Sequence, residues 1–366
     1  MHTLDWIIVG SGLYGATVAH ELQKRGLSVA VIEARNHVGG NCYTEEREGI
    51  HVHVYGPHIF HTSKKEIWDF INQFAPFNDY RHRGRARIGD KIYSFPINLL
   101  TMNQMWGVNS PEEAEYYLQG TRIPCDNPRT VEDWALATMG WELYEAFFHG
   151  YSTKQWGRPP SELPAFIAKR LPYRFTHDDS YFPDTDKYQG IPIGGYTQIF
   201  ERMLQGCMVI TGVDFLEHRT AFEKMAPNIL YTGCVDELFG YGEGHLEYRS
   251  LRFEHEVVDR DFQGCAIVNY PELSVPYTRI AEHQHFEFGG KSRSIITREY
   301  PQDHTPGTTP YYPIRDDLNK RLHGKYMQRA VNLFPNYHFG GRLASYQYYD
   351  MDMTIAAALT LTQKLV

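Results

Sequence analysis

Short apolar runs alternate with a helical pattern at the start of the chain. Residues 5–10, DWIIVG, form an apolar run that ends in glycine, which is typical of a buried parallel strand. Residues 10–26 predict a turn followed by a helix, and residues 27–34 predict a second strand. The chain therefore begins with a β-α-β unit, and we expect an α/β fold with a parallel sheet.

The pattern changes along the rest of the chain. Residues 76–97 predict a small β segment, and residues 245–300 alternate apolar and polar positions as antiparallel strands do. Residues 162–172 predict a short helix, and strand–turn–helix patterns return at residues 190–204 and 228–233. Pieces typical of a dinucleotide-binding sheet thus occur at the start, in the middle and at the end, so we expect interleaved domains.

Helices dominate the pattern over residues 110–171. Pro111 follows Ser110, an arrangement typical of the first helical position after an N-cap. Thr130 with Asp133 resembles a capping box in which Asp replaces the usual Glu. Both pairs predict where helices begin.

Composition restricts the partners of the protein. The chain has 366 residues and a formal net charge of −8, and it contains no long run of Lys or Arg. A nucleic-acid ligand would need a basic stripe, so none is expected. An anionic substrate would have to be held by a few placed arginines. The 26 tyrosines indicate buried binding surfaces, where an apolar ring carries a polar tip.

The cysteines and the hydropathy predict the compartment. The five cysteines are odd in number and form no C-x-x-C pair, which fits a reducing cytosol and argues against a disulfide framework or a Cys-based zinc site. No apolar run approaches the roughly 18 residues of a membrane span. The N-terminus enters a strand at once, so no signal peptide is expected. We therefore expect a cytoplasmic protein without a membrane span.

Glycines between the first strand and the helix form a G-x-G-x-x-G fingerprint. Gly10 and Gly12 let the chain turn tightly and approach a pyrophosphate, and Gly15 lets helix and strand pack closely. The helix N-terminus adds amide donors and a partial positive charge. Glu33 ends the next strand 18 residues after Gly15, where it can bind ribose hydroxyls. Together these residues predict a dinucleotide site.

The segment after Glu33 favours FAD over NAD. Its E-x-R-x-x-G-G pattern resembles that of glutathione-reductase-like FAD proteins, in which Gly39 and Gly40 let the chain pass back over the pyrophosphate. The late GGR at 340–342, followed by a helix near Asp350, resembles the same class. No second G-x-G-x-x-G appears, so no separate NAD(P)H domain is expected. The alternative interpretation of the segment is a surface turn.

These patterns predict the fold class α/β, with a Rossmann-like FAD-binding domain of the glutathione-reductase type, an inserted helical domain and an antiparallel β-sheet domain. The expected boundaries are 1–75, 186–242 and 318–366 for the FAD-binding domain, 98–180 for the helical domain with its mobile substrate loop, and 76–97 and 243–317 for the sheet domain.

Four histidines crowd into the stretch HVHVYGPHIFHT at 51–62. His51 and His53 alternate on a predicted strand and share a face, whereas His58 and His61 follow in a loop. Three of them could bind zinc, but no carboxylate or cysteine lies at ligand spacing, so we expect no metal. Structural or solvated roles are favoured for His51 and His53. His58 follows the segment along the cofactor and can reach the isoalloxazine.

This histidine stretch resembles the Y-G-x-H-I-F-H-T segment of the UDP-galactopyranose mutase family. Further matches run in order along nearly the whole chain and suit the bacterial type: GYSTKQWG (150–157), ELPAFIAKRLPYRFT (162–176), YFPD (181–184), YQGIPIGGYT (188–197), LEYRSL (246–251), VPYTRI (275–280), PYYPI (310–314) and FGGRLASYQYYDM (339–351). The resemblance implies that the histidine loop lies against a flavin and holds no metal.

The family interconverts UDP-galactopyranose and UDP-galactofuranose, which supplies galactofuranose for cell-surface glycans. The resemblance implies that N5 of reduced FAD attacks the anomeric carbon and displaces UDP, that the ring recloses through another hydroxyl, and that UDP returns. No net electron transfer occurs, so this is nucleophilic catalysis by a cofactor. It also implies UDP as a ligand, a homodimer and a separate, unidentified reductant.

The resemblance implies roles for individual residues. Arg170 and Arg279 match the two diphosphate arginines and, with His58 beside the flavin, are the expected catalytic residues. The other expected substrate contacts are His82, Phe147, Tyr151, Trp156, Tyr181, Phe182, Arg249, Asn269, Tyr312, Tyr348 and Asp350. The expected FAD contacts are Gly10, Gly12, Tyr14, Gly15, Glu33, Ala34, Arg35, Gly39, Gly40, Asn41, His58, Ile59, Arg342, Asp350 and Met351.

Plainer interpretations remain open for several of these residues. Phe147 and Tyr151 belong to an i, i+3, i+4, i+7 stripe that is typical of a helix core. Arg170 can complement a helix C-terminus, and Arg279 can be a solvated strand residue. His82 occupies a position at which relatives carry Asn, which leaves its contact undefined.

Two other functions compete with the mutase. A flavin oxidase or dehydrogenase of the amine-oxidase type shares the fingerprint but consumes redox equivalents of its substrate. A nucleotide-sugar-binding protein with a structural FAD is the non-enzymatic alternative. Few apolar residues anchor the stretch 173–182, so we expect a lid over residues 165–182 that opens for the UDP-sugar.

Overall fold

The computed structural model describes residues 4–171, 173–290, 292–305 and 307–365, and within these the side chain of Arg170 is left out. The chain forms two compact units that each combine separated stretches. The first unit comprises Met1–Asn78, Gly190–Tyr248 and Pro310–Val366, and the second comprises Asp79–Gln189 and Arg249–Thr309. The finer division into three domains stays a prediction.

A parallel sheet in the order β16-β10-β1-β2-β9 forms the centre of the first unit. Every residue of β2 is buried, because helices cover both faces of the sheet. The sequence-based prediction of an α/β fold with a parallel sheet is therefore confirmed. The strands are β1 (Trp6–Val9), β2 (Val29–Glu33), β9 (Met208–Thr211), β10 (Asn228–Tyr231) and β16 (Tyr337–Phe339).

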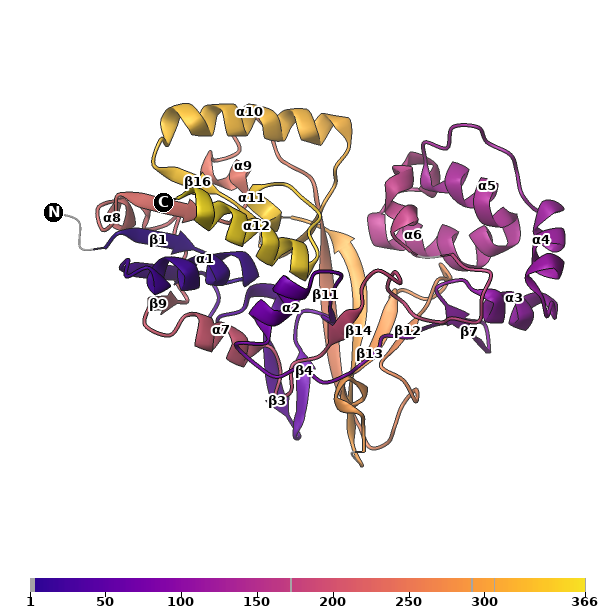
Figure 1. The fold of residues 1–366 in the computed structure, drawn as a ribbon. Helices are drawn as coiled ribbons and strands as arrows, with labels where there is room; N and C mark the ends of the chain where they lie inside the picture. The colour runs from indigo at the N-terminus through magenta and orange to yellow at the C-terminus, as the bar shows by residue number, and fades with distance from the viewer. Residues whose placement is uncertain (1–3, 172, 291, 306, 366) are drawn as a thin grey trace. The chain divides into compact units, whose positions relative to one another are not determined.

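Successive residues of β1 point to opposite faces of this sheet. Ile8 packs with α1 (Leu13–Lys24), α7 (Thr197–Met203) and α12 (Met351–Lys364) in one apolar cluster, and α1 and α12 lie side by side (Figure 1). Ile7 joins a second cluster on the other face. This alternation follows from the two-residue period of a strand.

The first unit contains further elements outside this sheet. They are η1 (Gly40–Cys42), β3 (Thr44–Arg47), β4 (Ile50–His53), β5 (Phe60–Thr62), α2 (Lys65–Ile71), α8 (Arg219–Glu223), α9 (Val235–Leu238), β15 (Pro310–Pro313), α10 (Asp317–Leu333) and α11 (Gly341–Ala344). His51 and His53 lie on β4 as predicted. The placement of His61 in a loop was wrong: it lies on β5, where its neighbours Phe60 and Thr62 are buried and fix the strand.

The second unit contains a mostly antiparallel sheet in the order β11-β14-β13-β12-β6-β7. Strands β12 and β6 run parallel, which the alternating pattern could not reveal. The strands are β6 (Gly84–Ile88), β7 (Lys91–Phe95), β11 (Tyr248–Val258), β12 (Ile267–Asn269), β13 (Arg279–Glu282) and β14 (Ser294–Asp303), with η5 (His283–Glu287) after β13. The short strand β8 (Tyr188–Gly190) spans the point in the sequence at which the second unit ends and the first resumes.

Helices of the second unit begin where the capping signals predict. The Ser110 side chain accepts a bond from an amide of the first turn with Pro111 at N1, and Thr130 and Asp133 form a reciprocal capping box. The short helix predicted within residues 162–172 is present as the 3₁₀ helix Ala165–Arg170, which begins after its N-cap residue Pro164, and Pro172 lies outside the described residues. The elements are α3 (Leu99–Trp106), α4 (Pro111–Gln119), α5 (Val131–Leu143), the π-helix η2 (Tyr144–His149), α6 (Gly150–Trp156), η3 (Pro160–Glu162) and η4 (Ala165–Arg170).

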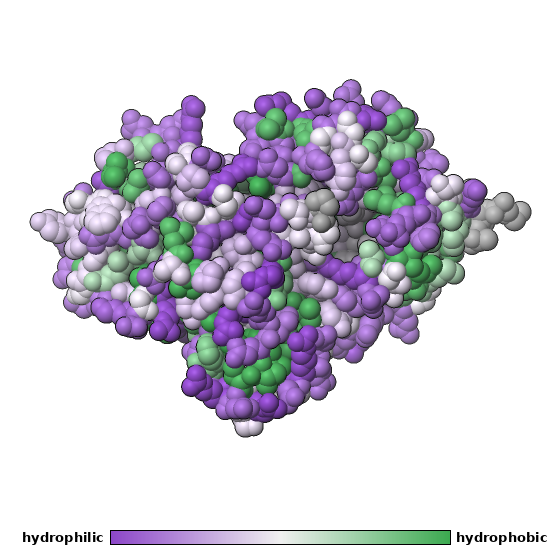
Figure 2. Space-filling model, turned by 180° about the vertical axis from the view of Figure 1, so that it is seen from behind, coloured by the Kyte–Doolittle hydropathy of each residue, from purple (hydrophilic) through white to green (hydrophobic). Residues whose placement is uncertain are grey.

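One face of the molecule is mostly polar. Figure 2 shows a face on which hydrophilic residues dominate and apolar residues form separate patches. Among the described residues, no helix has the length and the apolar character that crossing a membrane requires.

Candidate active site

The first glycine turn is shaped by close backbone contact. Gly10 has a φ of +96°, and a Cβ atom on Gly15 would lie 2.0 Å from the Gly10 carbonyl oxygen. Only glycine at both positions therefore lets α1 start directly behind β1. Gly12 is the N-cap residue of α1, so the amides of the first helical turn follow it.

A second pair of glycines approaches this turn. Gly39 and Gly40 both have positive φ, and a Cβ on Gly40 would lie 3.0 Å from the Gly12 Cα atom. The Gly39 amide also donates to the Ser11 carbonyl over 3.2 Å. The glycines of two turns thus face each other beside a helix N-terminus. This cradle fits the pyrophosphate of FAD, which needs close approach and amide donors.

Glu33 holds the first glycine turn in place. Its Oε2 atom accepts from the Ser11 amide at 2.8 Å and from the Ser11 hydroxyl at 2.7 Å, and its Oε1 atom accepts from the Arg35 amide at 2.9 Å. Oε1 has a further lone pair for a ribose hydroxyl, whereas both lone pairs of Oε2 are used by Ser11. Ala34 follows at the exposed end of β2.

Arg35 has a buried donor that makes no hydrogen bond with the residues that the structure describes. Its guanidinium lies 4.1 Å above the Tyr55 ring, and its Nη2 atom donates to Asn41 Oδ1 at 2.8 Å. Its Nη1 atom is buried without a hydrogen bond. A buried donor of this kind costs free energy until it meets an acceptor. An oxygen of the adenosine half of FAD would satisfy it.

The last stretch of the first unit, residues 310–366, contributes a tyrosine pair and an arginine to the candidate site. The rings of Tyr312 and Tyr348 stack with centroids 5.3 Å apart, and the Arg342 guanidinium lies 5.9 Å from each ring. Arg342 is held by donation to the Tyr349 carbonyl at 2.7 Å. Asp350 is the N-cap residue of α12. A positive side chain and a helix N-terminus therefore occur together, which suits an anionic or electron-rich ligand.

Tyr14 and Met351 line the inner part of this unit. Burial raises the pKa of Tyr14 to about 12, so its hydroxyl stays protonated and can donate. A Cβ on Gly340 would lie 2.3 Å from the Tyr14 ring, so glycine is required there for space. The Met351 sulfur accepts a 3.7 Å contact from the buried Cys42 thiol.

The histidine loop is fixed by its own side chains. The Nδ1 atom of the buried His53 accepts from the His58 amide at 3.0 Å. His58 Nδ1 lies 2.8 Å from the Gly56 carbonyl, which can only accept, so that nitrogen carries the proton. Ile59 is buried beside it. His53 therefore has the structural role that we expected, and it sets the position of His58.

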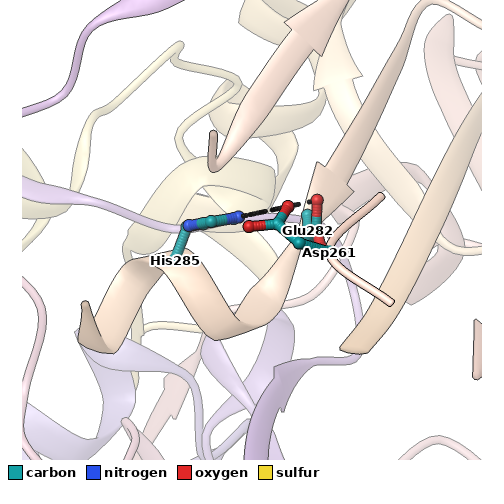
Figure 3. A group of neighbouring side chains, drawn as sticks. All are labelled: Asp261, Glu282 and His285. Carbon is teal, nitrogen blue, oxygen red and sulfur yellow. Dashed lines mark hydrogen bonds and ion pairs between the residues drawn. The ribbon is translucent and has the colours of Figure 1, made fainter. Parts of the chain in front are cut away.

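One group of possible metal ligands lies elsewhere. In the part of the chain that the structure describes, the only such group is Asp261, Glu282 and His285, and Figure 3 shows His285 pointing from η5 toward the two carboxylates. Glu282 is fully buried and accepts from the amides of Phe262 and Gln263. Through these two hydrogen bonds Glu282 stabilises the turn at residues 261–264. The four histidines at 51–61 are not part of this group.

Aromatic side chains of the second unit gather around His82. The His82 ring lies 4.6 Å from the Tyr181 ring and 6.0 Å from the Phe182 ring. Phe95 continues the cluster, 6.4 Å from Tyr181 and 6.0 Å from Phe147. Four predicted substrate residues thus belong to one aromatic cluster. The Tyr80 hydroxyl lies 3.1 Å from His82 Nδ1, which fixes the ring.

The predicted helical stripe is interrupted by the π-helix η2. Tyr144 and Phe147 are buried, as the core interpretation expects, whereas Tyr151 is half-buried in the next helix, α6. A π-helix changes the residues per turn, so spacing alone could not place Tyr151. Trp156 ends α6 and is buried.

Arg279 lies on a face of the second unit's sheet beside Asn269. The two are register partners in β13 and β12, and Asn269 Nδ2 donates to the Arg85 carbonyl at 3.0 Å. Arg279 Nε donates to Glu299 Oε2 at 2.8 Å. Glu299 was not among the predicted site residues, because its position opposite Arg279 depends on strand register. Arg279 is therefore oriented rather than merely solvated.

Arg249 contacts α6 rather than open solvent. Its Nε atom donates to the Gln155 carbonyl at 2.9 Å, its Nη2 atom donates to the Lys154 carbonyl at 3.2 Å, and its Nη1 atom pairs with Asp303. These bonds satisfy carbonyls at the end of a helix. The described contacts thus give Arg249 a supporting role for α6.

The predicted lid is held by a polar clamp. Arg174 donates to the Ser180 carbonyl at 2.6 Å and to the Phe182 carbonyl at 2.9 Å, and it pairs with Asp184 at 3.0 Å. Arg174 was not among the predicted site residues, although three aspartates follow it within ten residues, a signal that the sequence offers. Arg170 ends η4, and its side chain lies outside the described residues.

Comparisons with known proteins agree on one family. A family model described as UDP-galactopyranose mutase matches residues 146–348, and one described as an NAD(P)-binding Rossmann-like domain matches residues 8–74. The chain is 41% identical to the probable UDP-galactopyranose mutase of Klebsiella pneumoniae, covering 98% of this chain and 94% of the relative. It is 39% identical to the dTDP-fucopyranose mutase of Escherichia coli, covering 98% and 97%. A crystal structure of reduced UDP-galactopyranose mutase shares the fold, with a TM-score of 0.74 at 14% identity over 100% of this chain and 94% of that one.

Proposed function

Because the chain belongs to the UDP-galactopyranose mutase family, we propose that it interconverts UDP-galactopyranose and UDP-galactofuranose. The family is flavin-dependent and its members are isomerases, and the glycine cradle, Glu33 and Arg35 fit FAD as the cofactor. The product would supply galactofuranose for cell-surface glycans.

The observation that carries the proposal is the oriented Arg279. A diphosphate leaving group needs a cation with forked donors at a fixed position. Arg279 meets this need, because the buried Glu299 holds it beside Asn269 on one sheet face. A dehydrogenase acting on an uncharged amine would not need such a residue. This favours the mutase over the amine-oxidase alternative.

The residues of the chain have two tasks in this reaction. When bound and reduced, FAD supplies the nucleophile for the anomeric carbon without net electron transfer. Arg170 and Arg279 hold the diphosphate, and the aromatic residues exclude water and hold the uridine. The proposed substrate contacts are His82, Phe147, Tyr151, Trp156, Tyr181, Phe182, Asn269, Tyr312, Tyr348 and Asp350, with Arg249 in support.

The similarity to a dTDP-fucopyranose mutase defines the competing substrate. The test is to incubate the FAD-loaded protein with UDP-galactofuranose, with and without dithionite, and to separate the products. Parallel reactions contain dTDP-fucofuranose. We expect UDP-galactopyranose only in the reduced reaction, at a higher kcat/KM than the dTDP-sugar. Preference for the dTDP-sugar would reassign the substrate, and turnover that consumes dithionite stoichiometrically would favour a redox enzyme.

We further propose a homodimer, a cytoplasmic location and a separate reductant. The family membership supports all three, and light scattering of the purified protein tests the first.

A further inference from the structure

Lys154 lies at a point where backbone carbonyls of one loop converge. Its Nζ atom donates to four of them at 2.6 to 2.9 Å, those of Tyr270, Glu272, Val275 and Tyr277. Four carbonyl dipoles that point at one position repel each other unless a cation lies between them. The ammonium of Lys154, with its three N–H donors, supplies that cation.

The same loop approaches the backbone of α6 very closely. A Cβ on Gly150 would lie 2.3 Å from the Pro271 carbonyl oxygen and 3.2 Å from the Leu273 amide. Only glycine allows this contact. The loop and the first turn of α6 are therefore in direct backbone contact. Lys154, one helical turn after Gly150, adds side-chain hydrogen bonds between the same helix and loop.

The other side of the loop has contacts of its own: the Gly89 amide donates to Glu272 Oε2 over 2.8 Å, and the rings of Tyr270 and Tyr277 pack with centroids 4.9 Å apart. It borders a cavity of about 370 Å³ that Tyr270, Glu272, Val275 and Tyr277 line with residues of neighbouring strands. Lys154 provides the hydrogen bonds from the side of α6. Removing its charge would take a donor from all four carbonyls, and the Glu272 carbonyl would keep the bond that it accepts from the Val275 amide over 3.2 Å.

Helix α6 and the loop that Lys154 joins to it both lie next to proposed substrate contacts. Helix α6 bears Tyr151 and Trp156, and the loop joins Asn269 at the end of β12 to Arg279 at the start of β13. We propose that Lys154 is a positioning residue that sets the distance between the aromatic contacts on α6 and the diphosphate contact Arg279. This inference rests on the proposed function and extends it to a residue that touches no substrate.

The test is Lys154→Met in the FAD-loaded protein, which keeps the length of the side chain and removes its charge. We expect the Kd for UDP, measured by titration calorimetry, to rise about tenfold, which corresponds to about 1.4 kcal/mol. The KM for the UDP-sugar should rise with it, while kcat changes less than about threefold and FAD content stays constant. Lys91→Ala, an exposed lysine of the same unit, is the matched control.

Chemical rescue separates positioning from a general loss of stability. In Lys154→Ala, millimolar propylammonium should restore UDP binding by occupying the four-carbonyl site, whereas tetramethylammonium, which has no N–H donors, should not. Gly150→Ala offers a second variant that keeps the charge and separates loop from helix, and it should weaken UDP binding as well. A folded Lys154→Met protein with unchanged UDP affinity would overturn the inference.

Hydrogen exchange tests whether Lys154 holds the loop 270–277, independently of the proposed reaction. Amides of residues 270–277 should exchange faster in Lys154→Met than in the wild-type protein, even without UDP. If the two proteins differ in exchange in this way but the wild-type protein does not bind UDP, the proposed function is refuted. The role of Lys154 in holding the loop against α6 would still stand. Equal exchange in both proteins would refute that role.

Discussion

Arg279 and Glu299 are direct partners across strands β13 and β14, and the Arg279 Nε atom donates to Glu299 Oε2 over 2.8 Å. The Glu299 side chain is 2% exposed and that of Arg279 is 21% exposed, so the pair has a buried anchor and an accessible cation. The carboxylate lies 2.8 Å from both Nε and Nη2, so it fixes the plane of the guanidinium, part of which remains accessible to a ligand. This arrangement prepares Arg279 for a diphosphate.

The first prediction concerns this anchor. Glu299→Gln keeps an acceptor but removes the charge, and we expect UDP affinity to fall about tenfold because charge-assisted bonds are about twice as strong as neutral ones. Glu299→Ala should cost more, since the guanidinium loses its partner altogether. Titration calorimetry measures both. Glu256→Gln, at an exposed pair on the edge of the same sheet, should leave UDP binding unchanged. Wild-type affinity in Glu299→Ala would contradict the anchoring role.

The second prediction concerns the diphosphate arginines. Arg170→Ala and Arg279→Ala should each lower kcat/KM about a hundredfold, since one charge-assisted bond to developing charge contributes on the order of 3 kcal/mol. The FAD content should not change, because neither residue belongs to the glycine cradle. Steady-state kinetics with the reduced protein gives the result. Near-wild-type turnover in either variant would remove that arginine from the site.

The third prediction concerns space for the flavin. Gly340→Ala would place a Cβ atom 2.3 Å from the Tyr14 ring, which is packed and cannot yield easily. Tyr14 should shift into the cofactor site, and the purified protein should carry much less FAD. The ratio of flavin to protein absorbance measures this. Gly324→Ala on exposed α10 meets no atom within 4 Å and should keep full FAD, with a gain of about 0.5–1 kcal/mol in helix stability.

The fourth prediction concerns thiol reactivity. Burial raises the pKa of the Cys42 thiol to about 12, whereas Cys125 is exposed. Because the thiolate is the reactive form, iodoacetamide at pH 8 should label Cys125 and leave Cys42 unlabelled in the folded protein. Mass spectrometry of peptides reads this out, and urea should make Cys42 reactive. Rapid labelling of Cys42 in the native protein would show that the segment beside the glycine cradle opens.

Local signals account for what the sequence predicted well. Gly10, Gly12 and Gly15 act through contacts within a few residues, and Thr130 with Asp133 closes a single helical turn. Such features can be identified before any tertiary structure is known. The parallel sheet followed from the same short-range pattern of strand, turn and helix.

Long-range features could not be predicted in this way. The carbonyls around Lys154 lie 116 to 123 residues away in the chain, and Glu299 faces Arg279 only because of the register between two strands. The π-helix at Tyr144–His149 breaks the regular helical spacing of the aromatic stripe. His61 lies on a strand rather than in the predicted loop, and its neighbours Phe60 and Thr62 are buried. In each case tertiary packing decided the outcome.

The last prediction concerns the lid. UDP should protect residues 165–182 from hydrogen exchange in the reduced protein, because closure must exclude water from the reacting sugar. Arg170→Ala should weaken this protection. Arg174 donates to the carbonyls of Ser180 and Phe182, so Arg174→Ala should speed exchange over 178–184 even without UDP.

The two variants distinguish closure from simple loosening. A lid that closes on its ligand loses protection in Arg170→Ala only when UDP is present, whereas loss of the clamp in Arg174→Ala affects both states. The exposed Lys187→Ala in the same unit should match the wild-type protein in both. Equal exchange across 165–182 with and without UDP would rule out the lid, because a segment that does not respond to the ligand cannot control its access.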